Sequence, residues 1–261
     1  MQNKDLKTIY EKVYKKGEGT HYSKLLFSKN KVSIDKKAVL GEINWKGKIV
    51  LDVGCGTGEL VNILAGLGAK IVLGVDYSAS AIAIAKRLYS RKNISFKCLN
   101  ANEVEGKYDV ITSLGAIEHF DNPFGVVRRF RQMLRPGGSI IIVSPNWSNP
   151  RGYMLMTLKL LFDARITLAD LHYFTPLDFK HWADLLGMRL KWRTIDYDWA
   201  MGRRLVSDFK RRIPRVIRDS KLPKNKKRIG QFIKWIEQTV IKIEHPQKYS
   251  GAIGIYHFRK R

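Results

Sequence analysis

The chain has 261 residues, 44% of them hydrophobic, and its 48 Lys and Arg against 23 Asp and Glu give a net charge of +25. The only two cysteines, Cys55 and Cys98, exclude a disulfide framework and a cysteine-based zinc cluster. No apolar run approaches the ~20 residues that cross a bilayer, and the charged start of the chain lacks the apolar core of a signal peptide. We therefore expect a cytoplasmic protein with no integral membrane segment.

The positive charge is concentrated at both ends of the sequence. Residues 1–48 carry 12 Lys/Arg against 5 Asp/Glu, residues 49–200 carry 18 against 14, and residues 201–261 carry 18 against 4. Such basic extensions suit anionic partners, namely nucleic acid, acidic lipid or phosphorylated glycan. The alternative, given equal weight, is that these charges form a solvated surface and bind no partner.

The first half of the chain predicts one helix and then an alternation of strands and helices. The first 40 residues have the apolar spacing of an amphipathic helix. After residue 48, helices are expected at Glu59–Gly66 and Ser78–Leu88, and the alternation is typical of an α/β protein with a doubly wound parallel sheet. The segment Leu134 to Ser139 predicts a helix end followed by a Pro-Gly-Gly turn. The expected strands are Ile49–Val53, Ile71–Asp76, Ser95–Cys98, Asp109–Leu114 and Ser139–Ser144.

The second half departs from this rhythm. Residues 145–171 form an insertion that we interpret as an apolar lid, and a helix at Pro176–Leu186 and a strand at Arg189–Tyr197 follow it. Residues 203–245 are basic and mostly helical, and the last strand is expected at Ala252–Phe258. An apolar stripe in this basic segment indicates core packing in preference to a membrane or partner surface. The lid residues are Tyr153, Met154, Leu158 and Phe162; the stripe is Ile229, Phe232, Ile233, Ile236, Val240 and Ile243.

A glycine-rich loop, LDVGCGTGEL, follows the first strand. Gly54, Gly56 and Gly58 allow positive φ angles and a close approach of the backbone to a ligand. A dinucleotide fingerprint requires a third glycine where this chain has Glu59, and a phosphate-binding P-loop requires Gly-Lys-Ser/Thr. The pattern therefore predicts a nucleoside ligand whose tail is not strongly anionic.

The ends of the next three strands supply further binding residues. Asp76 ends the second strand and is placed to accept hydrogen bonds from both hydroxyls of a ribose. Tyr77 follows it, and its ring is placed to stack on a purine. Asn100 and the N–H of Ala101 follow the third strand, where a base edge would be read. Leu114 ends the fourth strand and faces the same crevice. Asp76 as a helix cap and Asn100 as a turn residue are the structural alternatives.

The ordered segments VLDVGCGTG, GVDYS, LNANEV, YDVITSLGAIEHFDNP and LRPGGSIIIVSPN resemble class I S-adenosylmethionine-dependent methyltransferases. The resemblance covers about residues 47–197 and is strongest to the group that includes ubiquinone-biosynthesis O-methyltransferases. It implies a Rossmann-like seven-stranded sheet with an antiparallel last strand. The implied division is a helical extension at 1–46, a cofactor-binding domain at 47–200 and 250–261, and a basic helical cap inserted at 201–249.

The same resemblance implies roles for the predicted site residues. Asp52 and the glycine loop, including Cys55, would hold the methionine part of the cofactor, Asp76 the ribose, and Asn100 with Ala101 the adenine. The family usually has Asp at the position of Asn100, but an amide carbonyl can also accept a hydrogen bond from the adenine amino group. A sulfonium cation suits a site with Asp52, Asp76 and Glu59.

Motifs that the sequence lacks limit the choice of the nucleophile that accepts the methyl group. Neither cysteine is placed for pyrimidine C5 methylation, and no Asn/Asp-Pro-Pro-aromatic box follows the fourth strand. His119 is a candidate base, with a structural hydrogen-bonding role as its alternative. His172 and Tyr173 are candidates for the base or for contacts to the acceptor. Gly115 stands where metal-recruiting relatives have a carboxylate, so no metal site is predicted.

We therefore expect O-methylation of a small-molecule, glycan or lipid-linked acceptor. The alternatives are an RNA methyltransferase that grips phosphates with the basic segment, or a cofactor-binding regulator without catalysis. The basic helical segment is expected to form a cap beside the acceptor pocket, with the basic runs KRRIPR (210–215) and KNKKR (224–228) as a cationic rim in water. Peripheral contact with anionic membrane is the partner interaction that this rim suggests.

Overall fold

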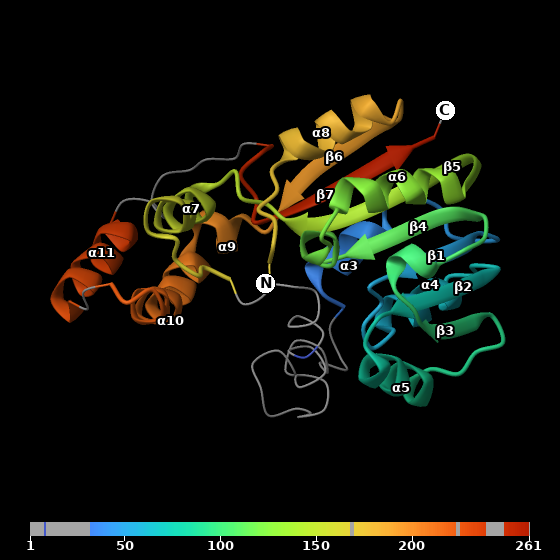
Figure 1. Ribbon diagram of the computed structural model, residues 1–261, viewed down its shortest axis with the longest axis horizontal. Coiled ribbons are helices and arrows are strands. Elements are labelled where there is room, and N and C mark those ends of the chain that lie inside the picture. Colours follow the sequence, from blue (N-terminus) through green and yellow to red (C-terminus); the bar gives the residue numbers. More distant parts are fainter. Residues whose placement is uncertain (1–7, 9–31, 168–169, 223–224, 239–247, 261) are drawn as a thin grey trace. The chain divides into compact units, whose positions relative to one another are not determined.

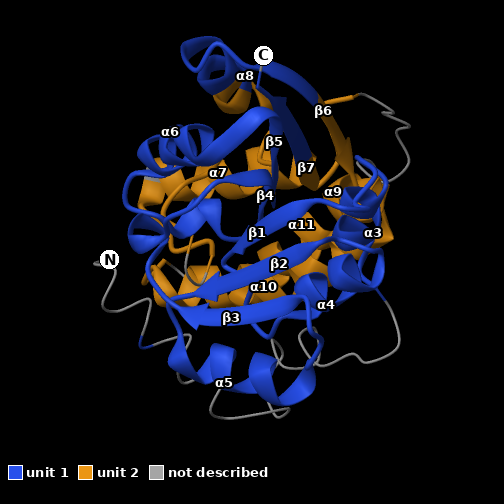
Figure 2. Ribbon diagram, turned by 90° about the vertical axis from the view of Figure 1, so that its right-hand side faces the viewer, with its two compact units in different colours: residues 1–144, 180–191, 255–261 blue, residues 145–179, 192–254 orange. Residues whose placement is uncertain are grey.

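The computed structural model describes residues 8, 32–167, 170–222, 225–238 and 248–260. The predicted N-terminal amphipathic helix falls mostly outside these residues, apart from helix α3 (Ile34–Leu40). The chain divides into two compact units, residues 1–144, 180–191 and 255–261, and residues 145–179 and 192–254 (Figure 2). The second unit includes more of the chain than the insertion predicted at residues 201–249.

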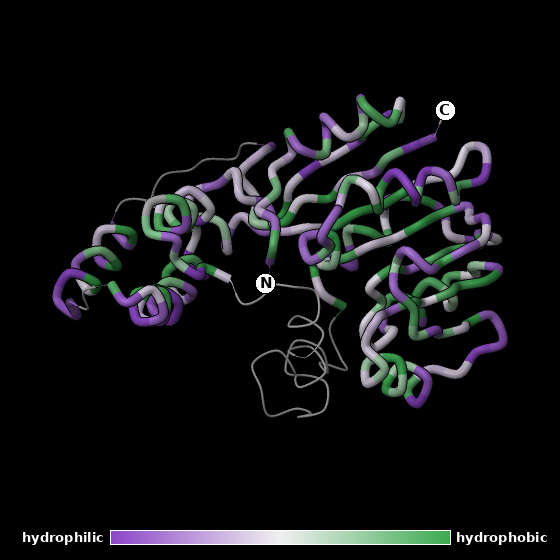
Figure 3. The backbone as a smooth tube through the Cα atoms, in the orientation of Figure 1, coloured by the Kyte–Doolittle hydropathy of each residue, from purple (hydrophilic) through white to green (hydrophobic). Residues whose placement is uncertain are grey.

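A seven-stranded sheet confirms the predicted fold. Its strand order is β3-β2-β1-β4-β5-β7-β6, in which β1 to β5 are parallel and β7 runs in the opposite direction (Figure 1). Hydrophobic stretches follow the central strands (Figure 3) because these strands are buried on both faces. The strands are β1 (Ile49–Val53), β2 (Ile71–Asp76), β3 (Ile94–Cys98), β4 (Tyr108–Leu114), β5 (Leu134–Pro145), β6 (Arg189–Ile195) and β7 (Ile253–Arg259).

Local sequence signals explain where the helices of the first unit begin. Ser78 caps α5 (Ala79–Leu88), since its Oγ accepts the N–H of Ala81 at 3.2 Å. Asn122 caps α6 (Pro123–Met133) in the same way, with Pro123 at the first helical position. Helix α4 (Glu59–Gly66) instead begins at Gly58, which offers no side chain, so its first N–H groups face the glycine loop. Helix α8 (Pro176–Leu185) follows α7 in the chain.

The Pro-Gly-Gly segment is not the turn that the sequence predicted. Strand β5 already begins at Leu134, which pairs with Tyr108, and pairing resumes between Ser139 and Val110. Four residues therefore bulge out opposite one residue of β4, with Gly137 at a φ of 70°. The ladder on both sides of this bulge makes the segment part of one long strand.

A buried histidine joins three elements of the first unit. His257 of β7 is fully buried, with Nε2 3.0 Å from Ser139 Oγ and Nδ1 3.4 Å from Glu42 Oε2. Burial, followed by the positive charge of Arg259, lowers the pKa of His257 below its ordinary value of 6.5, although Glu42 acts in the opposite direction. The nearby Lys191 adds to the lowering. The folded protein therefore favours the neutral imidazole.

We expect the contribution of His257 to the stability of the protein to be lost as the pH falls from about 7 towards 5. The unfolded chain binds the imidazole proton more tightly than the folded chain, so acidification favours unfolding. His257→Gln should remove this part of the pH dependence, whereas His181→Gln, at an exposed position, should retain it. Urea unfolding at several pH values measures the effect. Equal pH slopes for the wild type and the His257→Gln variant would contradict the assignment.

The second unit has its own hydrophobic core, formed by residues of helices α7, α10 and α11 and of the segments around α7. Ile233 and Ile236 are buried in it, and Ile229 and Phe232 pack against it. The predicted stripe therefore packs in a core as far as it is described, while Val240 and Ile243 lie outside the described residues. The helices are α7 (Pro150–Phe162), α9 (Tyr197–Met201), α10 (Arg203–Asp219) and α11 (Lys226–Gln238).

The residues interpreted as an apolar lid divide into two groups. Met154 and Leu158 pack on the core of the second unit. Tyr153 and Phe162 are 62% and 51% exposed on α7. Within the described part of the chain, no helix is both long and apolar enough to pass through a membrane.

A buried ionic cluster connects α7 and α10. Asp208, 3% exposed, accepts hydrogen bonds from Arg151 Nε at 3.2 Å, Arg212 Nε at 2.9 Å and Arg211 Nη2 at 3.1 Å. Burial raises the pKa of Asp208, but Arg212 and Arg151 together hold it below 3.8. Arg212 also donates to the carbonyl of Ile166 at 2.7 Å. The prediction that the basic run 210–215 stays in water is therefore wrong for Arg212, because a buried carboxylate lies one turn before it.

Candidate functional site

The glycine loop has a backbone that only glycine fits at two positions. Gly54 has a φ of 76°, and a Cβ there would lie 2.5 Å from the Cβ of Ala116. Gly58 has a φ of 82°, and its Cβ would lie 2.6 Å from the ring of Phe96. Gly56 also has a positive φ, of 53°. The loop thus turns sharply between β1 and α4 with little side-chain bulk.

Hydrogen bonds fix this loop against the end of β2. The N–H groups of Gly54 and Cys55 both donate to the carbonyl of Val75, at 2.9 and 3.0 Å. The N–H of Gly56 donates to Asp76 Oδ2 at 2.9 Å, and Asp76 Oδ1 accepts the N–H of Ser78 at 2.9 Å. The carboxylate is therefore oriented from both sides, while carboxylate oxygens have lone pairs for further donors. The predicted ribose acceptor and the glycine loop lie together.

Asp52 is the second carboxylate of the site. It pairs with Thr112 in the sheet register, and Thr112 Oγ1 donates to its Oδ1 at 2.6 Å. Burial raises the pKa of Asp52 from 3.8 to about 6, with a further rise from Asp76, while Thr112 and Lys36 lower it. A buried carboxylate of this kind gains stability from a cationic ligand.

Lys36 is a residue of this site that sequence analysis missed. It extends from α3, forms an ion pair with Glu59 at the start of α4, and its charge acts on Asp52. The only sequence signal is Glu59 itself, whose charge at the mouth of the loop favours a cationic neighbour. Lys36 therefore adds a positive charge near the end of the loop and pairs it with Glu59.

The remaining predicted cofactor residues lie at the ends of β2, β3 and β4. Tyr77 follows Asp76 directly, and Leu114 is the last residue of β4. Asn100 Oδ1 accepts the N–H of Asn102 at 3.1 Å, so this side chain caps the short helix Ala101–Glu103. The structural alternative for Asn100 is thus realised, although its carbonyl has a second lone pair. Burial raises the pKa of the Cys55 thiol well above 9.0, which makes it a loop-packing residue and not a nucleophile.

The three candidate catalytic residues lie in different units. His119 belongs to the first unit and ends the short helix Ile117–His119, one turn after β4. Its neighbour Glu118 is buried and accepts a hydrogen bond from Ser144 Oγ at 3.3 Å. His172 and Tyr173 belong to the second unit, where His172 stacks on Phe174 at 5.4 Å. Tyr173 meets the ring of Trp147 edge-on at 4.9 Å.

The sequence and the fold resemble those of known proteins. The family described as "Methyltransferase domain" matches residues 26–190. The ubiquinone biosynthesis O-methyltransferase of Pseudomonas fluorescens (strain Pf0-1) is 30% identical over 159 residues, which cover 57% of this chain and 68% of that protein.

Two solved structures share the fold at low identity. An S-adenosylmethionine-dependent methyltransferase from Mesorhizobium loti has a TM-score of 0.55 at 14% identity and covers 87% of this chain and 96% of its own. Phosphoethanolamine N-methyltransferase 2 of Haemonchus contortus, in complex with S-adenosyl-L-methionine, has a TM-score of 0.58 at 16% identity. The match covers 96% of this chain and 60% of the Haemonchus chain. Among these proteins, the Pseudomonas relative is named for O-methyl transfer and the Haemonchus protein for N-methyl transfer.

Proposed function

Because the chain belongs to the class I S-adenosylmethionine-dependent methyltransferases, we propose that it methylates a hydroxyl group of a small-molecule, glycan or lipid-linked acceptor. S-adenosylmethionine is its cofactor. When bound, this cofactor supplies an electrophilic methyl group on a positively charged sulfur. The chain's own residues must then bind the cofactor, align the acceptor and exclude water.

The observation that carries this proposal is the position of two carboxylates beside the glycine loop. Asp76 is oriented by the N–H groups of Gly56 and Ser78, which suits a ribose with two hydroxyl donors. Asp52, with its raised pKa, suits the cationic ammonium of the methionine part. No phosphate-binding lysine follows Gly58, so the loop does not favour a pyrophosphate.

A hydroxyl acceptor requires a base, because the oxygen loses its proton as it bonds to the methyl carbon and the carbon–sulfur bond breaks. His119, one turn after β4, is the candidate in the cofactor-binding unit. His172 and Tyr173 are the candidates in the second unit. The name of the Pseudomonas relatives supports oxygen as the nucleophile, as does the absence from the sequence of the two nucleic-acid motifs considered above.

Transfer of a labelled methyl group from the cofactor to a cell extract tests the acceptor class. The extract is separated into RNA, lipid and small-molecule fractions after the reaction. We expect label in the small-molecule, glycan or lipid fraction, and His119→Ala, His172→Ala and Tyr173→Phe are then compared on that acceptor. Label in RNA alone would favour the RNA methyltransferase, an alternative that the basic sequence of α10 supports. No label in any fraction would favour a regulator.

We expect Asp76→Ala to lower the affinity for S-adenosylmethionine about thirtyfold, or about 2 kcal/mol, because the ribose hydroxyls lose a charged acceptor. Isothermal titration with the cofactor and, separately, with NAD measures this. Glu105→Ala is the control, since it removes an exposed carboxylate of the same unit. Tighter binding of NAD than of S-adenosylmethionine by the wild type would contradict the proposed binding site.

A further inference from the structure

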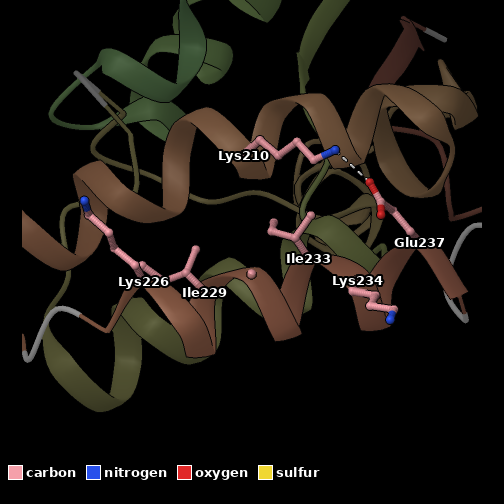
Figure 4. Close-up of a pocket in the computed structure, with 7 residues that line it drawn as sticks. Lys210, Lys226, Ile229, Ile233, Lys234 and Glu237 are labelled. Atoms are coloured by element: carbon pink, nitrogen blue, oxygen red, sulfur yellow. Dashed lines mark hydrogen bonds and ion pairs between the residues drawn. The ribbon is translucent and has the colours of Figure 1, made fainter.

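A groove of about 520 Å³ lies between α10 and α11 of the second unit (Figure 4). Lys210 of α10 and Glu237 of α11 form an ion pair at 2.8 Å near one end, and Lys226 lies at the other end. The side chains of Ile229 and Ile233 point into the space between these ends. The groove therefore has a charged rim and an apolar floor.

The rim carries an excess of positive charge. Three lysines line the groove, Lys210, Lys226 and Lys234, against the single carboxylate Glu237. Lys226 and Lys234 are exposed and form no ion pair with any described residue. An anion at this rim would therefore meet two ammonium groups that are not already neutralised.

The floor is open at Gly230. This glycine lies inside α11, where Gly destabilises a helix by about 1 kcal/mol relative to Ala. A Cβ at this position would meet no atom within 4 Å. No close packing contact thus requires glycine here, and its missing side chain leaves the floor accessible.

We propose that the α10–α11 groove binds the surface of an anionic phospholipid bilayer. Lys226 and Lys234 would contact lipid phosphates, and Ile229, which is half-buried, would contact the apolar part below the head group. The apolar floor favours lipid over RNA, because a sugar–phosphate backbone has no apolar group to cover it.

Co-sedimentation of the full chain with vesicles tests the proposal without any methyl transfer, so its outcome is separate from that of the proposed function. We expect binding to phosphatidylcholine vesicles that contain phosphatidylglycerol, and little binding to phosphatidylcholine alone. Binding should weaken in high salt, which screens the lysines. Equal, negligible binding to both vesicles at low salt would overturn the proposal.

Two variants test which residues act. Lys226→Glu with Lys234→Glu should lower the vesicle partition coefficient about thirtyfold or more, since each basic residue near an anionic surface contributes to binding. Lys70→Glu with Lys92→Glu makes the same change in net charge at exposed positions of the first unit and should have a much smaller effect. Equal losses in the two double variants would show a non-specific effect of net charge and overturn the assignment.

A single-stranded RNA oligonucleotide tests the alternative ligand. If the Lys226→Glu, Lys234→Glu variant lost binding to a single-stranded RNA oligonucleotide and kept its vesicle binding, the surface would be an RNA site instead.

Discussion

Asp208→Asn is expected to destabilise the second unit by about 3–5 kcal/mol. The carboxylate of Asp208 is the common acceptor for Arg151, Arg211 and Arg212, and it is 1% exposed as a side chain. Its replacement by a neutral amide removes the main compensating charge of the Arg151 guanidinium, which is only 9% exposed. The loss is large because the charge that remains is already removed from water.

Urea unfolding, followed by hydrogen exchange at the amides of α7 and α10, measures the loss of stability in the second unit. Asp219→Asn is the matched control, since Asp219 is on the same helix but pairs with Arg218 at an exposed position. Adding Arg151→Met to Asp208→Asn should recover part of the stability, because it removes one of the buried charges. An Asp208→Asn variant as stable as the Asp219→Asn control would contradict the assignment of this cluster.

The sheet and the glycine loop could be predicted because their signals are local in sequence. Strands β1 and β2 and helix α4 begin and end at the predicted residues, since apolar runs there stop at Gly or Asp. The loop between Gly54 and Gly58 requires positive φ angles, and glycine is the residue that adopts them at least cost. The order of strand ends then follows from the parallel topology.

The missed features depend on residues that are distant in sequence. Lys36 and Glu59 are 23 positions apart, and the charge of Glu59 does not indicate which lysine of the chain pairs with it. The charge run at 210–215 reads as a solvated face, but Asp208 and Arg151 come together only when α7 and α10 pack. The bulge before Ser139 has the composition of a turn, and only pairing with β4 shows that the strand continues on both sides.

Asp52→Asn is expected to have opposite effects on stability and on cofactor affinity. Since the pKa of Asp52 is about 6 in the folded protein and 3.8 in its ordinary state, the folded chain holds the proton more tightly. The stability of the cofactor-free protein should therefore fall as the pH rises from about 4 to 6. The variant lacks this slope and should be more stable above pH 6 by up to about 3 kcal/mol.

In the proposed binding site the ammonium group of the cofactor contacts the ionised carboxylate of Asp52, so we expect the cofactor to reverse this preference. Asp52→Asn should therefore bind S-adenosylmethionine about 2–3 kcal/mol more weakly near pH 7.5. The wild-type affinity should fall about tenfold between pH 7.5 and 5 as Asp52 is protonated, while the affinity of the variant stays nearly constant. Titration calorimetry and urea unfolding over this range measure both effects, with Glu105→Gln as an exposed control.

Parallel pH profiles for the wild type and Asp52→Asn would exclude Asp52 as the ammonium partner. A variant that lost stability together with affinity would instead show that the carboxylate supports the fold. Stabilisation with weaker binding is the combination expected of a residue kept for its ligand.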